Sequence, residues 1–268
     1  MKGKFLYESA GSFGIADAEF SDKNVILMAG PCSVESAEQM EKVSKAIAGH
    51  GLKFMRGGAY KPRTSPYSFQ GMGAEGIRIL EATCRKSGLL SVSEVMDTRD
   101  VAEMARHIDI LQIGARSMQN FALLKEAGKP GRPVLLKRGM SATVEELLMS
   151  AEYMLKEGNR KVILCERGIR TFGTETRNTL DISAVPILKA KTQLPVIVDP
   201  SHGTGRKDLL LPMAKAAIAA GANGIMAEVH PDPDNAKSDQ NQQMNLDEFS
   251  SYVAGLRDFC KRLGKRLA

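Results

Sequence analysis

Short apolar runs alternate with amphipathic segments along this chain from about residue 24 to its end. The runs are rich in Val, Ile and Leu without polar alternation, which is typical of strands covered on both faces in a parallel sheet. Eight such runs predict strands, at residues 25–29, 53–56, 89–94, 110–113, 134–137, 162–166, 196–199 and 224–228. Eight strand–helix units in roughly 250 residues have the size and rhythm of a (β/α)8 TIM barrel, so we predict that α/β fold.

The segments between the runs carry helix start and stop signals. Thr143 and Glu146 stand at capping-box spacing and begin a helix predicted over residues 143–156. Gly221 follows the Ala-rich segment 208–220 and is a typical helix stop. A doubly wound sheet is the competing architecture, but the glycine fingerprint of its cofactor-binding loop is missing from the sequence.

The chain divides into a short N-terminal extension, residues 1–20, and one catalytic barrel, residues 21–268. The run from Gly11 to Gly14 suggests a turn, so the extension is predicted to form a small β-hairpin across the bottom of the barrel. No linker, low-complexity segment or close repeat interrupts the barrel region.

Composition excludes several classes of function. Trp is absent and aromatic residues make up 5%, so stacking on nucleic-acid bases has little to work with. The net charge of +6 is mild, and the cations follow strands rather than one helix face, so no nucleic-acid partner is expected. No apolar run approaches the roughly 20 residues of a membrane helix, and no signal pattern begins the chain. The four cysteines show no CxxC spacing, and we expect a cytoplasmic protein without disulfides or a membrane partner.

In such a barrel the active site forms at the C-terminal ends of the strands, so the residues that follow each run are the first candidates. Two subsets stand out there. The cations are Arg56, Lys61, Arg63, Arg116, Lys137, Arg167 and Arg206, with Glu94 at the end of the third strand. The residue types that bind metals are Cys32, His202, Glu228 and Asp239.

The cations after the strands indicate an anion-binding pocket. Lys and Arg on the glycine-containing loop 56–65 suit a small, multiply charged anion, because Arg offers a planar fork and Lys a compact charge. A single Arg at a strand end has a plain alternative as a surface ion pair, which is worth little. Five of these cations at one barrel mouth, however, would repel each other unless an anion neutralises them, so we infer a functional pocket. The five are Arg56, Lys61, Arg116, Lys137 and Arg167.

The metal-type residues form a mixed set of one thiol, one imidazole and two carboxylates. Taken singly, Cys32 could be buried filler, His202 a cap, and Glu228 and Asp239 ion-pair partners. Taken together they predict a site for a divalent transition metal in preference to Mg²⁺ or Ca²⁺, without choosing which metal. His230 lies close to Glu228 in the sequence and is a further candidate to line the site.

Seven motifs on successive strand ends identify a family. They are Gly30-Pro31-Cys32-Ser33-Val34-Glu35, Lys61-Pro62-Arg63-Thr64-Ser65, Ile113-Gly114-Ala115-Arg116, Leu135-Leu136-Lys137-Arg138-Gly139, Cys165-Glu166-Arg167-Gly168-Ile169-Arg170, Asp199-Pro200-Ser201-His202-Gly203-Thr204-Gly205-Arg206 and Ala227-Glu228-Val229-His230-Pro231. In this order they resemble the 3-deoxy-D-arabino-heptulosonate 7-phosphate (DAHP) synthases, in their compact bacterial and archaeal type. The resemblance covers nearly the whole chain from about residue 25.

The resemblance implies a transferase that condenses phosphoenolpyruvate with erythrose 4-phosphate to give DAHP and phosphate. This reaction opens the shikimate pathway to chorismate and the aromatic amino acids. By the family pattern, phosphoenolpyruvate would be held by Arg56, Lys61, Arg116, Lys137 and Arg167, with Glu94 among the substrate-binding residues. The phosphate of erythrose 4-phosphate would lie near Arg63, Thr64 and Ser65, with Arg206 as a further contact.

The family pattern also implies a metal cofactor and catalytic roles. The ligands would be Cys32, His202, Glu228 and Asp239, and the metal Mn, Fe, Co or Zn. Lys61 and His202 would be catalytic, with Lys61 as proton donor to the aldehyde oxygen. The family is typically a homo-dimer or homo-tetramer. The chain has no length for an added regulatory or chorismate mutase domain, so feedback control would need a regulatory partner protein.

Two alternatives stay open at this point. The sister enzyme makes 3-deoxy-D-manno-octulosonate 8-phosphate from arabinose 5-phosphate, and it usually carries Asn where Pro62 stands here. Pro62 and the Gly-Thr-Gly-Arg206 run favour the four-carbon sugar. The second alternative is a non-catalytic sensor of phosphorylated metabolites, against which the complete metal set argues.

Overall fold

Eight parallel strands close into a barrel, as the alternating pattern predicts. The computed structural model describes residues 5–268 except residues 10, 12 and 64. In chain order the barrel strands are β3 (Asn24–Gly30), β4 (Phe54–Arg56), β5 (Leu90–Glu94), β6 (Ile110–Ile113), β7 (Val134–Lys137), β8 (Val162–Glu166), β9 (Val196–Val198) and β10 (Gly224–Glu228). Each strand pairs in parallel with the next, and β10 pairs with β3 to close the ring. The predicted (β/α)8 fold is therefore confirmed.

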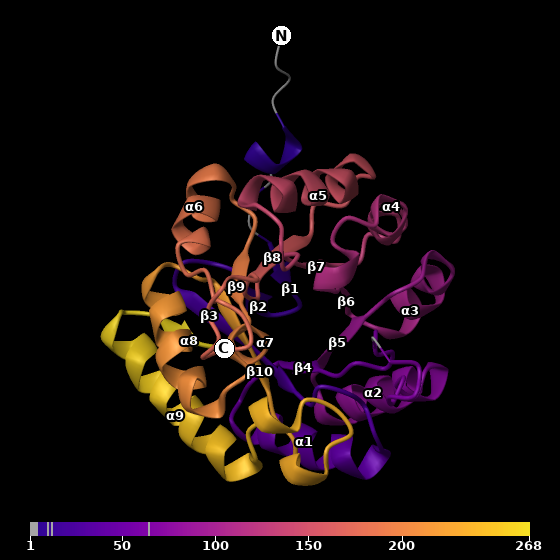
Figure 1. Cartoon of the computed structure of the whole chain (residues 1–268), viewed down its shortest axis with the longest axis vertical. Helices are drawn as coiled ribbons and strands as arrows, with labels where there is room; N and C mark the ends of the chain where they lie inside the picture. Colours follow the sequence, from indigo (N-terminus) through magenta and orange to yellow (C-terminus); the bar gives the residue numbers. More distant parts are fainter. Residues whose placement is uncertain (1–4, 10, 12, 64) are drawn as a thin grey trace.

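Helices surround the strands (Figure 1). The α-helices are α1 (Ala37–Gly49), α2 (Ala74–Ser87), α3 (Val101–His107), α4 (Phe121–Gly128), α5 (Val144–Lys156), α6 (Ala184–Lys191), α7 (Pro200–Thr204), α8 (Leu210–Ala219) and α9 (Leu246–Arg262). Short 3-10 turns are η1 (Leu6–Glu8), η2 (Thr98–Asp100), η3 (Ala115–Ser117), η4 (Lys207–Leu209), η5 (Pro233–Asn235) and η6 (Gln240–Gln242). Thr143 and Glu146 form the predicted capping box of α5. Among the described residues, no helix is both long and apolar enough to cross a membrane.

The side chains of the strands pack into two apolar cores. Ile26 and Met28 of β3 pack inside the barrel, whereas Val25 and Leu27 pack between the barrel and its helices. This two-residue alternation is the pleat of a strand that is buried on both faces. The continuous apolar runs are thus explained by two cores that the strands fill from both faces.

The N-terminal extension contains the predicted hairpin, but its turn lies at Ala16 and Asp17, after the run from Gly11 to Gly14 in which it was expected. Strand β1 (Gly14–Ile15) pairs antiparallel with β2 (Ala18–Glu19). Ala18 and Phe20 pack into the inner core with Phe54, the first residue of β4. The hairpin therefore closes the N-terminal end of the barrel and leaves the opposite mouth open for a site. At the other end of the chain, β11 (Arg266–Leu267) adds to β3 beside the barrel seam.

We expect the substitution Gly30→Ala to lower the free energy of unfolding by about 3 kcal/mol. Gly30 ends β3 with φ +150°, a backbone region that L-residues rarely adopt, and an added Cβ would collide with the backbone carbonyl of Arg56. Chemical denaturation followed by circular dichroism measures the change. Gly49→Ala is the matched control, because its Cβ would meet nothing within 4 Å at the end of α1. A Gly30→Ala protein as stable as the control would contradict this explanation of the strand end.

Candidate active site

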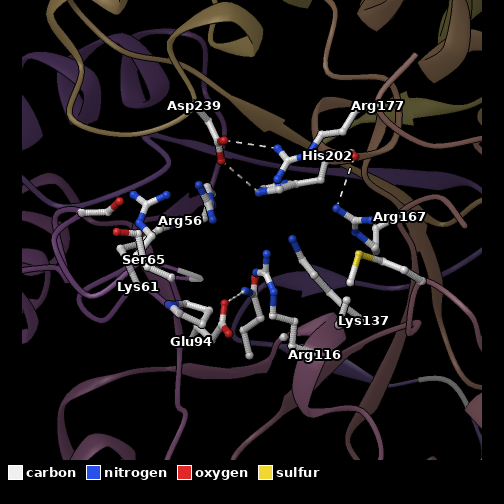
Figure 2. Close-up of a pocket in the computed structure, with 17 residues that line it drawn as sticks. Arg56, Lys61, Ser65, Glu94, Arg116, Lys137, Arg167, Arg177, His202 and Asp239 are labelled. Atoms are coloured by element: carbon white, nitrogen blue, oxygen red, sulfur yellow. Dashed lines mark hydrogen bonds and ion pairs between the residues drawn. The ribbon is translucent and has the colours of Figure 1, made fainter. Parts of the chain in front are cut away.

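A cavity of about 340 Å³ opens at the C-terminal mouth of the barrel. Cationic side chains from successive strand ends and loops point into it (Figure 2). They are Arg56, Lys61, Arg63, Arg116, Lys137, Arg167 and Arg177. Arg56, Lys61, Lys137 and Arg167 are all buried, so solvent does little to screen their mutual repulsion. This concentration of buried positive charge is the electrostatic signature of a site for a small anion with several negative charges.

Buried carboxylates balance part of this charge. Lys137 Nζ donates to Asp199 Oδ2 at 2.6 Å, and Arg56 Nη1 donates to Glu228 Oε1 at 2.7 Å. The Nε atom of Arg56 is buried without a hydrogen-bond partner among the described residues. An unsatisfied guanidinium donor in a cavity wall is costly unless a ligand accepts from it. Arg56 can therefore donate to a bound anion through Nε while Nη1 donates to Glu228.

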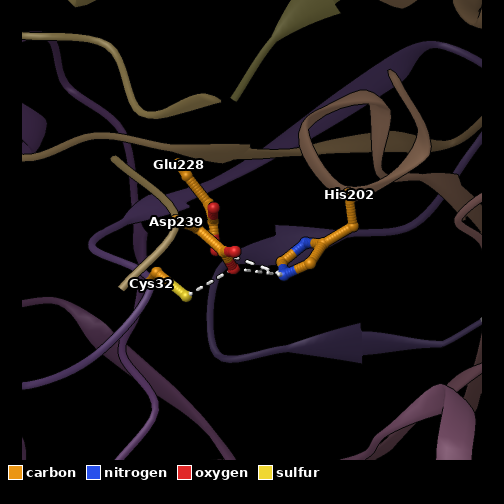
Figure 3. A group of neighbouring side chains, drawn as sticks. All are labelled: Cys32, His202, Glu228 and Asp239. Carbon is orange, nitrogen blue, oxygen red and sulfur yellow. Dashed lines mark hydrogen bonds and ion pairs between the residues drawn. The ribbon is translucent and has the colours of Figure 1, made fainter. Parts of the chain in front are cut away.

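The four metal-type residues converge at one edge of this cavity (Figure 3). One donor atom of each of Cys32, His202, Glu228 and Asp239 lies within 4.8 Å of all the others. Asp239 Oδ2 lies 3.1 Å from Cys32 Sγ and 3.8 Å from His202 Nε2, which is itself 3.4 Å from Glu228 Oε1. Tetrahedral coordination at bond lengths of about 2.1 Å places donors roughly 3.5 Å apart. The spacing and the donor types therefore fit one divalent transition metal.

The fold brings these four donors together from both ends of the sequence. Cys32 follows β3, and Glu228 ends β10, the strand that pairs with β3 to close the barrel. His202 lies on the short helix α7 after β9, and Asp239 lies in the loop after β10 with φ +50°. Closure of the barrel is thus the step that assembles the cluster.

His202 is oriented by a buried carboxylate. Its Nδ1 lies 2.8 Å from Asp199 Oδ2, which leaves Nε2 facing Glu228 and Asp239. Burial lowers the pKa of His202, which favours the neutral imidazole that a metal requires. Burial alone would raise the pKa of Asp199, but His202 and Lys137 hold it well below its ordinary value. A carboxylate behind a metal-binding histidine is a recurrent arrangement that fixes the ring.

Cys32 is set for metal binding rather than for exposed thiol chemistry. Burial, with the charge of Glu228, raises the pKa of its thiol to about 12, and the charges of Lys61 and Arg56 offset only part of this. Without a metal the sulfur is therefore protonated, and a bound cation would displace that proton. Lys61 Nζ donates to both the sulfur and the carbonyl oxygen of Cys32 at 3.0 Å. Lys61 thus lies where the cationic cavity meets the metal-type cluster.

The loop after β4 supplies the predicted sugar-phosphate residues. Arg63 and Ser65 line the cavity, together with Pro62 and Ser68, while Thr64 lies outside the described residues. Arg63 Nη2 donates to the hydroxyl of Ser238 at 2.5 Å, next to Asp239. The loop after β4 is therefore linked to the loop that carries a metal-type ligand.

Most of the predicted site residues meet in this one place. The lining includes Arg56, Lys61, Arg63, Ser65, Glu94, Arg116, Lys137, Arg167, His202 and Asp239, and the fully buried Cys32 and Glu228 complete the cluster. Arg206 is not brought to the cavity, since its side chain is exposed and bonds to Asp208. His230 does not line the cavity either, because its ring faces Glu35 and accepts from the backbone of Asp232.

Sequence reasoning missed several lining residues. Gln112 donates to Glu94 at 3.1 Å, Met140 follows the strand-end Lys137, and Arg177 lies ten residues after the strand-end Arg167. A search restricted to the first residues after each strand could not find Arg177. The only sequence signal for it was a cation within the same strand-to-helix loop.

A (β/α)8 barrel with a cationic cavity and a four-donor cluster at its strand ends defines an enzyme that handles phosphorylated anions beside a metal centre. A sequence model of the DAHP synthetase I family matches residues 17–263. The chain therefore belongs to the DAHP synthetase I family, and the resemblance seen in the motifs is confirmed.

Relatives of two kinds are similar to this chain. A phospho-2-dehydro-3-deoxyheptonate aldolase from Thermotoga maritima is 49% identical over 253 residues, which cover 94% of this chain and 75% of the relative. A 2-dehydro-3-deoxyphosphooctonate aldolase from Rhodopseudomonas palustris is 34% identical, with 87% of each chain covered.

Solved structures agree with the sequence comparison. A crystal structure of the T. maritima enzyme, a DAHP synthase, superposes with a TM-score of 0.94 at 47% identity and covers 97% of this chain and 76% of that one. A truncated form of that synthase gives a TM-score of 0.90 at 44% identity, covering 96% of this chain and 94% of the other.

Proposed function

We propose that this chain condenses phosphoenolpyruvate with erythrose 4-phosphate to give DAHP and phosphate, as the first enzyme of the shikimate pathway. The observation that carries the proposal is the shared position of two features, the buried cationic cavity and the four-donor cluster joined to it by Lys61. Phosphoenolpyruvate carries a carboxylate and a phosphate, so it needs several cations. The second substrate brings an aldehyde, which needs an electrophilic partner.

The cations divide between the two substrates in this proposal. Phosphoenolpyruvate is held by Arg56, Lys61, Arg116, Lys137 and Arg167, and the phosphate of the aldose by the loop with Arg63 and Ser65. Planar guanidinium groups grip carboxylate and phosphate oxygens in pairs, and this fixes the enol carbon in front of the aldehyde. Arg206, which pairs with Asp208 at the surface, has no support from the cavity lining.

Cys32, His202, Glu228 and Asp239 are the residues that would hold the metal. When bound, a divalent transition metal would supply Lewis-acid polarisation of the aldehyde carbonyl. The donor set suits Mn, Fe, Co or Zn, and it leaves the choice among them to supply and affinity.

Lys61 is the proposed proton donor in carbon–carbon bond formation. The enol carbon of phosphoenolpyruvate attacks the aldehyde carbon, and the aldehyde oxygen takes a proton from the Lys61 ammonium. Water then adds to the carbon that carries the phosphate, and cleavage of that carbon–oxygen bond releases phosphate. The position of Lys61 supports this role, because its Nζ lies 3.0 Å from the Cys32 sulfur and the side chain lines the cavity.

An assay of phosphate release identifies which sugar phosphate is the second substrate. A chelator-stripped sample is given Mn²⁺, phosphoenolpyruvate and either erythrose 4-phosphate or arabinose 5-phosphate. We expect metal-dependent turnover with erythrose 4-phosphate only, because the 49% identity to a heptonate aldolase exceeds the 34% identity to an octonate aldolase.

Other outcomes of this assay would replace the proposal. Turnover with arabinose 5-phosphate would assign the sister reaction. A sample that binds metal but releases phosphate with neither sugar would instead be a sensor of phosphorylated metabolites.

The cellular setting and assembly of the enzyme also stay proposals. We propose a cytoplasmic homo-dimer or homo-tetramer whose feedback control, if any, comes from a partner protein. All four cysteines are buried as free thiols, which is consistent with a reducing compartment. Mass measurement in solution and an assay with micromolar Phe or Tyr test the assembly and the control.

A further inference from the structure

Arg177 belongs to the loop between β8 and α6, and that loop is fastened to the helix that carries His202. The backbone N–H of Arg177 donates to Thr204 O at 2.8 Å, and that of Asn178 donates to Gly203 O at 3.0 Å. The Asn178 side chain also donates to His202 O at 3.0 Å. These hydrogen bonds fix the position of the Arg177 backbone relative to α7, and so the position from which its side chain extends into the site.

The guanidinium of Arg177 lies against the metal-type cluster. Its Nη1 atom donates to Asp239 Oδ1 at 3.2 Å and to Gln242 Oε1 at 3.0 Å. The other carboxylate oxygen of this residue, Asp239 Oδ2, is the one that faces Cys32 and His202. Arg177 therefore holds one oxygen of Asp239 aside while the other faces the cluster (Figure 2).

Gln242 connects Arg177 to a second metal-type residue, Glu228. Its amide accepts from Arg177 through Oε1 and donates through Nε2 to Glu228 Oε2 at 2.6 Å. Gln242 and Glu228 are both buried, so neither group has water as a substitute partner. One arginine thus holds Asp239 directly and Glu228 through a single amide.

The positive charge of Arg177 repels that of the neighbouring Arg167. Burial lowers the pKa of Arg167, and the like charge of Arg177 lowers it further. Placing Arg177 beside the buried Arg167 is unfavourable by itself, because the two charges repel. Asp239 forms an ion pair with Arg177 at 3.2 Å, and its carboxylate compensates for part of this repulsion, because it offsets part of the positive charge that Arg177 adds beside Arg167.

We propose that Arg177 is a positioning residue for the metal centre, which acts through Asp239 and, by way of Gln242, through Glu228. The inference rests on the proposed function for its relevance to catalysis, but the orientation of the ligands is a property of the protein without substrates. Hydrogen bonds to metal-binding carboxylates typically change metal affinity by about 10- to 100-fold when removed.

Metal binding by the substrate-free protein tests this proposal. Zn²⁺ or Mn²⁺ is titrated into stripped protein against a chromophoric chelator, for the wild type, Arg177→Met and Arg177→Lys. We expect Arg177→Met to weaken the metal affinity by about tenfold or more. Arg177→Lys should keep most of the affinity, because a single nitrogen, Nη1, makes both contacts now and an ammonium can replace it. Arg170→Met is the matched control, an exposed arginine in the same loop.

Activity gives a second readout that depends on the metal. The turnover of the Arg177→Met enzyme should still rise with added Mn²⁺ over a concentration range in which the wild-type turnover is already saturated. An Arg177→Met protein that binds metal as tightly as wild type, or more tightly, would overturn the proposal. In the first case Arg177 does not position the ligands, and in the second it only repels the cation. Neither result depends on which sugar the enzyme uses, so the proposal and the assigned reaction can fail separately.

A second variant protects the test against misfolding. Gln242→Met removes the contact to Glu228 and leaves Arg177 and Asp239 in place, and it should weaken metal binding by a similar factor. Because the two residues share one network, the double variant should lose less affinity than the product of the two single losses. Fully independent losses would overturn the connection through Gln242. Thermal unfolding of the metal-free variants shows that each one is folded.

Discussion

Replacing Cys32 by alanine is expected to abolish stoichiometric metal binding and to lower turnover by about 10²–10³-fold. Cys32 supplies the only sulfur donor of the cluster, with Asp239 Oδ2 and Lys61 Nζ within 3.1 Å of it. Loss of the metal would remove the proposed Lewis acid for the aldehyde carbonyl, and the loss of such electrostatic stabilisation costs about 10²–10³ in rate. Elemental analysis after dialysis and phosphate release measure the two effects.

Cys84→Ala is the control for that experiment. Cys84 is a buried thiol on α2 and packs in the outer core away from the cavity, as its helical position suggests. The variant should keep its metal and its turnover while losing a little stability. A Cys32→Ala protein that retained one metal per chain and full activity would show that the cluster is not the metal site.

The second large effect is expected for Lys61→Met, which should lower kcat by about 10²–10⁴-fold, the range for loss of a general acid. The ammonium is buried on the cavity wall, and no other cation of the described residues contacts both the Cys32 sulfur and its carbonyl oxygen. Phosphoenolpyruvate should still bind, because Arg56, Arg116, Lys137 and Arg167 line the same cavity. Binding by calorimetry and turnover by phosphate release separate the two roles.

Lys53→Met is the control, because Lys53 is a partly exposed lysine that pairs with Asp17 and does not line the cavity. Metal content must also be measured for Lys61→Met, since the lysine touches a metal-type ligand. Retained metal and phosphoenolpyruvate binding with little turnover would support a proton-donor role. Normal turnover in a variant that binds phosphoenolpyruvate would exclude it.

The barrel could be predicted because its strands are continuous apolar runs with two cores to fill. Predicted and observed strand limits agree at most ends and differ by one residue at the others, and Asp199 is the N-cap of α7 instead of the last residue of β9. The candidate residues at strand ends or soon after them, such as Lys137 and Arg116, were found for the same reason. Parallel strands in a barrel fix the position of the next residue at the C-terminal mouth.

Residues further along the loops could not be placed in this way. Arg177 and Gln242 reach the site through contacts with other loops, and Arg206 turns away to pair with Asp208. His230 also fails to line the cavity, because its ring faces Glu35 and accepts from the backbone of Asp232. Such placements depend on tertiary hydrogen bonds between segments far apart in sequence, which no local spacing encodes.

The pairing of β10 with β3 has a consequence for the order of events during synthesis. Cys32 is made before His202, Glu228 and Asp239 exist, and the strand that brings Glu228 to it is the last of the eight. A nascent chain that ends before β10 cannot hold the metal with this set of ligands. Coordination by all four of these residues would therefore follow closure of the ring. Until then, Cys32 lacks the three other donor residues that surround its thiol in the folded protein.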